Sequence, residues 1–167
     1  LGFVAETPAA LAGLVGDLYD LGAGDLDGDG DPDVVTTICF GSSDSSEVVL
    51  DNVAGSLQVD ALALPAAQDD CDVGTLLLDV DTDGDLDLFF GGTRFDRFNL
   101  KLYVNRGDGT FVAANVALPD LSAFDLQVNH AAGGDLDLDR DPDLVLALGP
   151  PYRNQNVPGA VFLLIIE

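Results

Sequence analysis

The stretch Asp25-Leu26-Asp27-Gly28-Asp29-Gly30-Asp31-Pro32-Asp33 places five carboxylates within nine consecutive residues. The same pattern returns over residues 79–87 and again over residues 135–143. Like charges a few ångströms apart repel one another, so a loop of this composition folds stably only around a strongly cationic partner. The three copies therefore predict three cation sites.

Calcium is the cation that this spacing favours. It takes about 6–8 oxygen ligands, which a loop can supply from positions 1, 3 and 5, the main-chain carbonyl of position 7 and a ligand at position 9. We predict about three Ca²⁺ sites on this pattern. Their ligand residues are Asp25, Asp27, Asp29, Asp31 and Asp33 in the first loop, Asp79, Asp81, Asp83, Asp85 and Asp87 in the second, and Asp135, Asp137, Asp139, Asp141 and Asp143 in the third.

Position 6 of each loop must let the chain turn around the ion, which favours a residue that tolerates positive φ. Gly30 and Gly84 meet this need, whereas the third loop has Arg140 there. A non-glycine residue in that conformation costs on the order of 1 kcal/mol, and the arginine charge also opposes a bound cation. We therefore expect the third site to be the weakest.

The residues after each loop favour strands over the helix of an EF-hand. An EF-hand needs a bidentate glutamate at position 12, where this chain has Thr36, Phe90 and Leu146. Short apolar runs follow instead, at residues 34–40, 86–90 and 144–148, and each ends before a glycine. An acidic, solvated strand face is the alternative interpretation of alternating aspartates, but five like charges on one face are unfavourable without a counter-ion.

Self-similarity extends beyond the loops. The loops start 54 and 56 residues apart, and residues 48–57 align with residues 102–111 at the offset of 54. Each repeat is predicted as a first strand (residues 18–24, 75–78 and 127–133), the acidic loop, a second strand, and a hairpin of third and fourth strands. Four antiparallel strands at this period indicate an all-β fold built from β-propeller blades.

The strand order predicts one propeller-type domain or segment over residues 1–167. Residues 1–11 read as the fourth strand of a blade, and three repeats follow at residues 12–65, 66–119 and 120–167. The last repeat ends after its third strand, so the strand missing at one end of the sequence is the strand present at the other.

Residues 24–35, 102–111 and 148–162 resemble the FG-GAP/VCBS repeats of integrin-α-type β-propellers. The resemblance covers nearly the whole chain, and the chain departs from the family pattern at Arg140 and in having three repeats. It implies a family ring of about seven blades, with one Ca²⁺ between the first and second strands of each. It also implies extracellular adhesion or ligand binding, or service as an accessory domain on a secreted enzyme.

Charge and composition indicate which classes of partner and which location to expect. The chain of 167 residues has 30 acidic and 6 basic residues and a net charge of −24, which argues against nucleic acid and anionic membrane surfaces. No apolar run is long enough to cross a bilayer, so no membrane insertion is expected. Low-affinity calcium loops suit extracellular fluid, so we expect a secreted or cell-surface protein. The chain starts at Leu1 without a signal peptide, and is expected to be a processed product or part of a longer chain.

Cys39 and Cys71 fall in different repeats. In an extracellular setting they could form a disulfide, and two buried free thiols remain the alternative. The tripeptide Arg106-Gly107-Asp108 matches one that some adhesion receptors bind, but glycine and aspartate are also what a hairpin turn requires.

We see no catalytic constellation and predict that the chain is not an enzyme. His130 has no serine or cysteine arranged beside it as a nucleophile, and metal-bound carboxylates are poor proton donors. Three functions fit the sequence: an extracellular calcium-binding propeller module for adhesion or for protein or glycan binding, with structural calcium; a structural subunit that assembles with copies of itself by strand exchange; and an accessory propeller of a secreted polysaccharide-active enzyme.

Overall fold

The computed structural model describes residues 11–12, 16–39, 46–65, 72–94, 97–118, 126–150 and 160–164. These residues form eleven strands in three antiparallel sheets. The predicted all-β class is confirmed. Within the described ranges no helix has the length and apolarity that a membrane span requires.

Each sheet follows the order of its strands along the chain. The first sheet contains β1 (Asp17–Gly24), β2 (Asp33–Cys39), β3 (Ser46–Val53) and β4 (Ser56–Asp60). The second contains β5 (Asp72–Leu78), β6 (Asp87–Arg94), β7 (Arg97–Asn105) and β8 (Phe111–Ala113). The third contains β9 (Gln127–Gly134), β10 (Asp143–Gly149) and β11 (Ala160–Leu164), with β10 in the middle.

The predicted order of strands within a repeat agrees with these sheets, with two differences. The second strand of the middle repeat does not stop before Gly91, because β6 continues through it to Arg94. A Cβ at Gly91 would lie 2.7 Å from Cγ2 of Val128, so this glycine allows the third sheet to approach closely rather than ending the strand. At the other end, residues 1–10 of the expected fourth strand lie outside the described residues, and Leu11 lies in a 3₁₀ turn with Ala12.

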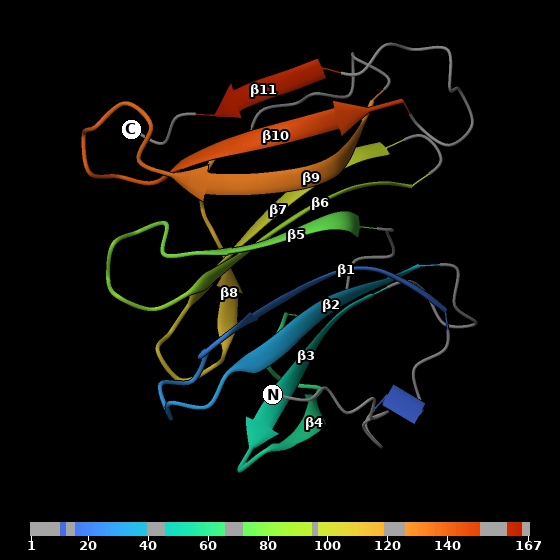
Figure 1. Cartoon of the computed structure of the whole chain (residues 1–167), viewed down its shortest axis with the longest axis vertical. Helices are drawn as coiled ribbons and strands as arrows, with labels where there is room; N and C mark the ends of the chain where they lie inside the picture. Colours follow the sequence, from blue (N-terminus) through green and yellow to red (C-terminus); the bar gives the residue numbers. More distant parts are fainter. Residues whose placement is uncertain are drawn as a thin grey trace, which may run out of the picture.

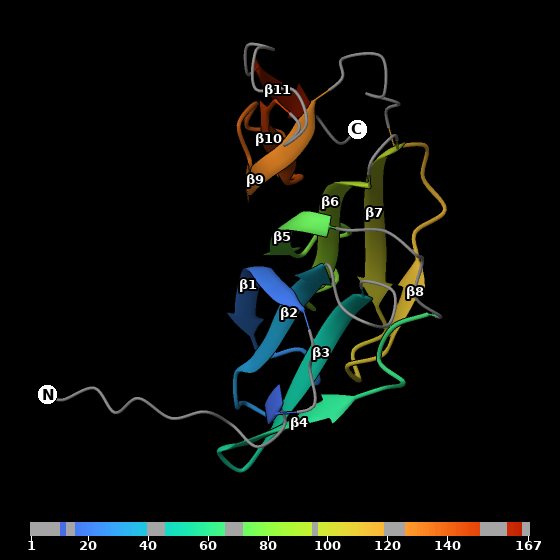
Figure 2. The same cartoon turned by 90° about the vertical axis from the view of Figure 1, so that its right-hand side faces the viewer.

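The three sheets lie one beside the next, and the first strands β1, β5 and β9 are neighbours (Figures 1 and 2). The loops that follow these three strands all lie on the same side of the molecule, at the left of Figure 1. The described residues form this open stack and no closed ring. The repeat therefore places its three acidic loops in equivalent positions along one side.

Two hydrophobic cores fill the spaces between the sheets, and β6 contributes to both. Leu88 and Phe90 lie in the first core, between the first and second sheets, whereas Phe89 lies in the second core, between the second and third sheets. This alternation follows from the period of two in a strand. The first core is Leu26, Val35, Val49, Ala63, Leu88, Phe90, Tyr103 and Phe111, and the second is Phe89, Leu102, Leu126, Val128, Ala131, Leu144, Leu146 and Leu148.

Candidate metal centre

A shared set of backbone hydrogen bonds shapes the three acidic loops. The aspartate at position 1 accepts a hydrogen bond from the N–H of position 6, at 3.1 Å in the first two loops and 3.2 Å in the third. The aspartate at position 5 accepts from the N–H of position 7, at 2.8, 3.0 and 3.0 Å. Each loop is therefore wound into the same turn by its own carboxylates.

Positive φ angles confirm the conformation expected at position 6, including the unfavourable one. Gly30 and Gly84 have φ of 94° and 101°, and Arg140 takes 87° in the same place. The third loop is thus strained where we expected it to be. Position 4 is also left-handed, which we did not predict: Gly28 has φ of 78°, and Thr82 and Leu138 have 61° and 68°.

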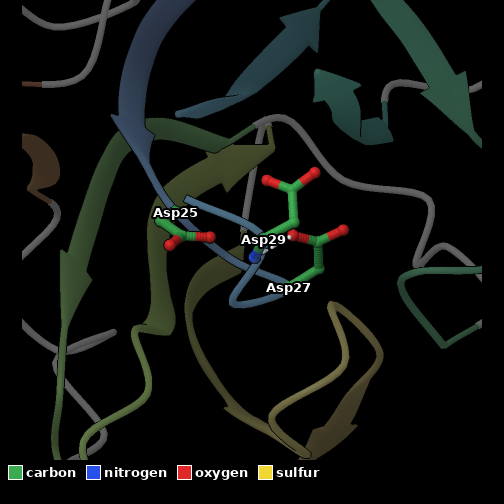
Figure 3. A group of neighbouring side chains, drawn as sticks. All are labelled: Asp25, Asp27 and Asp29. Atoms are coloured by element: carbon green, nitrogen blue, oxygen red, sulfur yellow. Dashed lines mark hydrogen bonds between the residues drawn. The ribbon is translucent and has the colours of Figure 1, made fainter. Parts of the chain in front are cut away.

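Three carboxylates come together in each loop. Their ligand atoms lie within 4.8 Å of one another in the groups Asp25, Asp27 and Asp29; Asp79, Asp81 and Asp87; and Asp135, Asp137 and Asp143. In Figure 3 the first group projects from the turn after β1, with the hydrogen bond from Asp29 N to Asp27 Oδ1 drawn as a dashed line. Clusters of this kind can hold a metal ion, because hard divalent cations prefer carboxylate oxygens.

Six predicted ligands lie outside these side-chain groups: Asp31, Asp33, Asp83, Asp85, Asp139 and Asp141. The grouping concerns side chains alone, so the predicted role of the position 7 carbonyls stays a prediction. Asp33 is buried, and its two carboxylate oxygens accept hydrogen bonds from the N–H groups of Leu26 and Asn52, both at 2.8 Å.

The aspartate at position 9 has a second role that sequence reasoning missed. Asp87 accepts hydrogen bonds from the N–H groups of Val80 and Asn105, both at 2.8 Å, as Asp33 does from the equivalent residues of its own repeat. It thereby fastens the acidic loop to the turn between the third and fourth strands. The offset of 54 conceals this equivalence, because the structurally matching Asn52 and Asn105 are 53 residues apart.

The third loop provides a test of whether the residues fit a cation. Asp143 is fully buried, Oδ2 accepts a hydrogen bond from the N–H of Leu136, and the buried Oδ1 has no partner among the residues that the structure describes. The equivalent oxygens of Asp33 and Asp87 each accept a backbone N–H from the end of the third strand, and the corresponding residue of the third repeat lies outside the described residues. A bound cation is a second kind of partner that would satisfy a buried carboxylate oxygen. The donor set of this site therefore fits a hard divalent cation.

The electrostatics of the second loop agree with that fit. Burial raises the pKa of the Asp81 carboxyl above its ordinary value, and the charge of Asp83 raises it further. Burial also raises the pKa of Asp87, although its two backbone hydrogen bonds oppose the shift. The repulsion among these carboxylates is what a cation would relieve.

The tripeptide Arg106-Gly107-Asp108 is exposed in the turn between β7 and β8. Gly107 and Gly109 have φ of 78° and 75°, and Asp108 Oδ1 accepts hydrogen bonds from the N–H and hydroxyl of Thr110. These observations support the turn interpretation of the motif, since they give its glycine and its aspartate a backbone role.

The state of one cysteine is now defined. Cys39 is buried at the end of β2 and is disulfide-bonded, and its Sγ lies 3.5 Å from the carbonyl oxygen of Asp72 in β5. The other cysteine of the sequence, Cys71, lies outside the described residues. The alternative of a free buried thiol at Cys39 is therefore wrong.

Residues 79–146 match the sequence model of a family described as FG-GAP-like repeat. No curated protein matches the chain. The matched segment runs from the second acidic loop, through β6 to β9 and the third acidic loop, into β10. Over that part of the chain the match confirms the resemblance to FG-GAP/VCBS repeats.

Proposed function

We propose that the chain is a non-catalytic, calcium-binding segment of a β-propeller, in which the ions are structural. The observation that carries the proposal is the convergence of three carboxylates at the equivalent loop of all three repeats. A bound Ca²⁺ supplies positive charge and accepts several oxygen ligands. The loops bind the ion and hold the first and second strands of each sheet in register beside it.

The side chain at position 2 of each loop supports a propeller arrangement. Leu26 is buried in the first core, against the second sheet, and Val80 packs against the second core, beside the third sheet. Leu136 occupies the same position in the third loop and is 55% exposed. The first two loops thus pack on the following sheet, and the third loop presents the apolar side chain that a further blade would cover.

We further propose an extracellular setting, with a protein or glycan as ligand. The disulfide at Cys39 suits an oxidising compartment, and weak calcium loops suit a fluid rich in Ca²⁺. Net charge of −24 leaves nucleic acid and membrane surfaces unfavoured as partners. The alternative of an accessory propeller on a polysaccharide-active enzyme stays a prediction from the resemblance.

Metal removal tests the calcium proposal. We expect EGTA to lower the melting temperature by many degrees, with recovery on adding Ca²⁺, because the carboxylates repel one another without it. In calorimetric titrations, the variants Asp27→Asn and Asp81→Asn should each bind one Ca²⁺ fewer than the wild type. The control variant Asp60→Asn, outside the loops, should bind as many Ca²⁺ ions as the wild type. An unchanged melt after verified removal of metal would exclude a structural ion.

Assembly with copies of itself is a second candidate function, favoured by the third sheet. In the described residues that sheet has three strands where the first two have four, and none pairs with the outer edge of β11. An open edge of this kind can accept a strand from another chain. Light scattering decides the matter: association that rises with concentration supports assembly, and a monomer at every concentration rules it out.

A further inference from the structure

The side chain of Asn105 joins the first acidic loop to the second. Asn105 is buried at the end of β7, and its Nδ2 donates to the carbonyl oxygens of Leu26, at 2.8 Å, and Leu86, at 3.0 Å. Leu26 lies between the first two aspartates of the first loop, and Leu86 between the last two of the second. One amide group therefore holds the backbones of two candidate ion sites in adjacent sheets.

The other polar groups of Asn105 also form hydrogen bonds. Its Oδ1 accepts a hydrogen bond from the N–H of Gly107 at 3.0 Å, and its own N–H donates to Asp87 Oδ1 at 2.8 Å. Asp87 belongs to the carboxylate group of the second loop. Because every polar atom of the side chain is engaged, the amide has a single orientation that serves both loops at once.

The turn that follows Asn105 touches both loops again. A Cβ added at Gly107 would lie 2.6 Å from Asp85 Oδ2 in the second loop, and one at Gly109 would lie 3.1 Å from Cβ of Asp27 in the first. The turn thus lies between an aspartate of the second loop and an aspartate of the first. A displacement of either loop meets this turn directly.

The equivalent residue of the first sheet lacks the bridging contact. Asn52 donates through Nδ2 to Pro32 in its own loop at 2.9 Å, and its Oδ1 accepts from the N–H of Gly55. Among the described residues, the hydrogen bonds of the Asn52 side chain thus lie within its own repeat. The contrast isolates the contact with Leu26 as the feature that makes Asn105 a bridge.

We propose that Asn105 is a positioning residue that couples the first two acidic loops, so that Ca²⁺ in the second loop strengthens Ca²⁺ binding in the first. This inference rests on the calcium proposal above. An ion that orders the second loop fixes Asn105 and thereby the Leu26 peptide, so the first loop has less ordering left to undergo. By thermodynamic linkage the effect is reciprocal.

Nuclear magnetic resonance of the full chain, titrated with Ca²⁺ alone, follows the two loops separately through the amides of Gly30 and Gly84. We expect Asp81→Asn, which disables the second loop, to weaken the binding seen at Gly30 by about fivefold or more, the usual range of such coupling. Asp27→Asn should weaken the binding seen at Gly84 by the same factor.

The role of Asn105 is tested by repeating this comparison in chains that carry a second substitution. In Asn105→Ala, adding Asp81→Asn should no longer weaken the Ca²⁺ binding seen at Gly30. In Asn52→Ala, the matched control, adding Asp81→Asn should still weaken it, even though Asn52→Ala itself weakens the first loop. Should Asn105→Ala lose the folded spectrum, Asn105→Ser replaces it, since one hydroxyl donates to only one of the two carbonyls. The coupling alone is overturned if Ca²⁺ binds at both glycines but disabling one loop does not change the affinity of the other. It is also overturned if Asp81→Asn still weakens binding at Gly30 in the Asn105 variants. Absence of any Ca²⁺ shift overturns the calcium proposal as well.

Discussion

Substituting Lys101 with methionine should destabilise the protein strongly, and increasingly so as the pH rises. Lys101 lies on β7, and its Nζ bonds to Asp72 Oδ2 at 2.7 Å and to Glu47 Oε1. The lysine side chain is 7% exposed and the two carboxylates are 4% and 2% exposed. The cluster is therefore a buried ionic contact between the first and second sheets.

The burial of this cluster determines how much stability the substitution should cost. A surface ion pair contributes about 0–1 kcal/mol, but removing one partner of a buried pair costs about 3–5 kcal/mol, because an uncompensated charge remains inside. We therefore expect Lys101→Met to lower the free energy of unfolding by about 3–5 kcal/mol near pH 7.5. For a domain of this size the loss corresponds to a melting temperature lower by about 6–20 °C.

The pH dependence follows from the two carboxyl groups. Burial raises the pKa of Asp72 from 3.8 to about 8, helped by its hydrogen bond to Glu47 and opposed by Lys101. Burial also acts on Glu47, but the hydrogen bond from Asp72 and the charge of Lys101 outweigh it and lower the pKa of that group. The folded state thus keeps the Asp72 proton that the unfolded state loses, so stability from this group is full below about pH 4 and is lost as the pH rises to about 8. Without Lys101 the pKa values of Asp72 and Glu47 both rise, so the folded state loses stability more steeply as the pH rises.

Urea unfolding followed by circular dichroism, at fixed Ca²⁺, measures the difference between wild type and Lys101→Met at pH 5 and pH 8. The difference should be larger at pH 8. A triple variant that adds Glu47→Gln and Asp72→Asn serves as control and should recover part of the loss, because it leaves no buried charge unpaired. A cost below about 1 kcal/mol at pH 8, or an equal cost at both pH values, would refute the reasoning.

Three further substitutions test other features. Arg140→Gly should raise stability by about 1 kcal/mol in a thermal melt and tighten Ca²⁺ binding at the third loop, because φ at this position is 87°; no gain would contradict the strain argument. Gly91→Ala should lower stability by about 1–3 kcal/mol in urea unfolding, since its methyl group would collide with Val128, and adding Val128→Ala should relieve the clash but not restore the lost packing. Cys39→Ser should lower stability by about 2–5 kcal/mol in the absence of reductant, and a wild type treated with reductant should melt at the same lowered temperature.

The sequence by itself determined the local features of this protein. The aspartate spacing predicted three equivalent loops, the runs after them predicted strands, and Arg140 identified the strained turn. These are properties of short segments, in which period, charge and backbone preference act over a few residues. The same local reasoning misjudged Gly91, because a glycine that ends a strand and one that admits a neighbouring sheet look alike in sequence.

Only the tertiary structure decided which side chains meet. It brought three carboxylates together in each loop and joined the aspartate at position 9 of the first two loops to the hairpin of its own repeat. It also placed Asn105 between two loops. It also gathered Glu47, Asp72 and Lys101 from three strands. The long-range contacts of Asp87, Asn105 and Lys101 join residues 18 to 79 positions apart. They depend on how strands and sheets pack on one another, which no local pattern encodes.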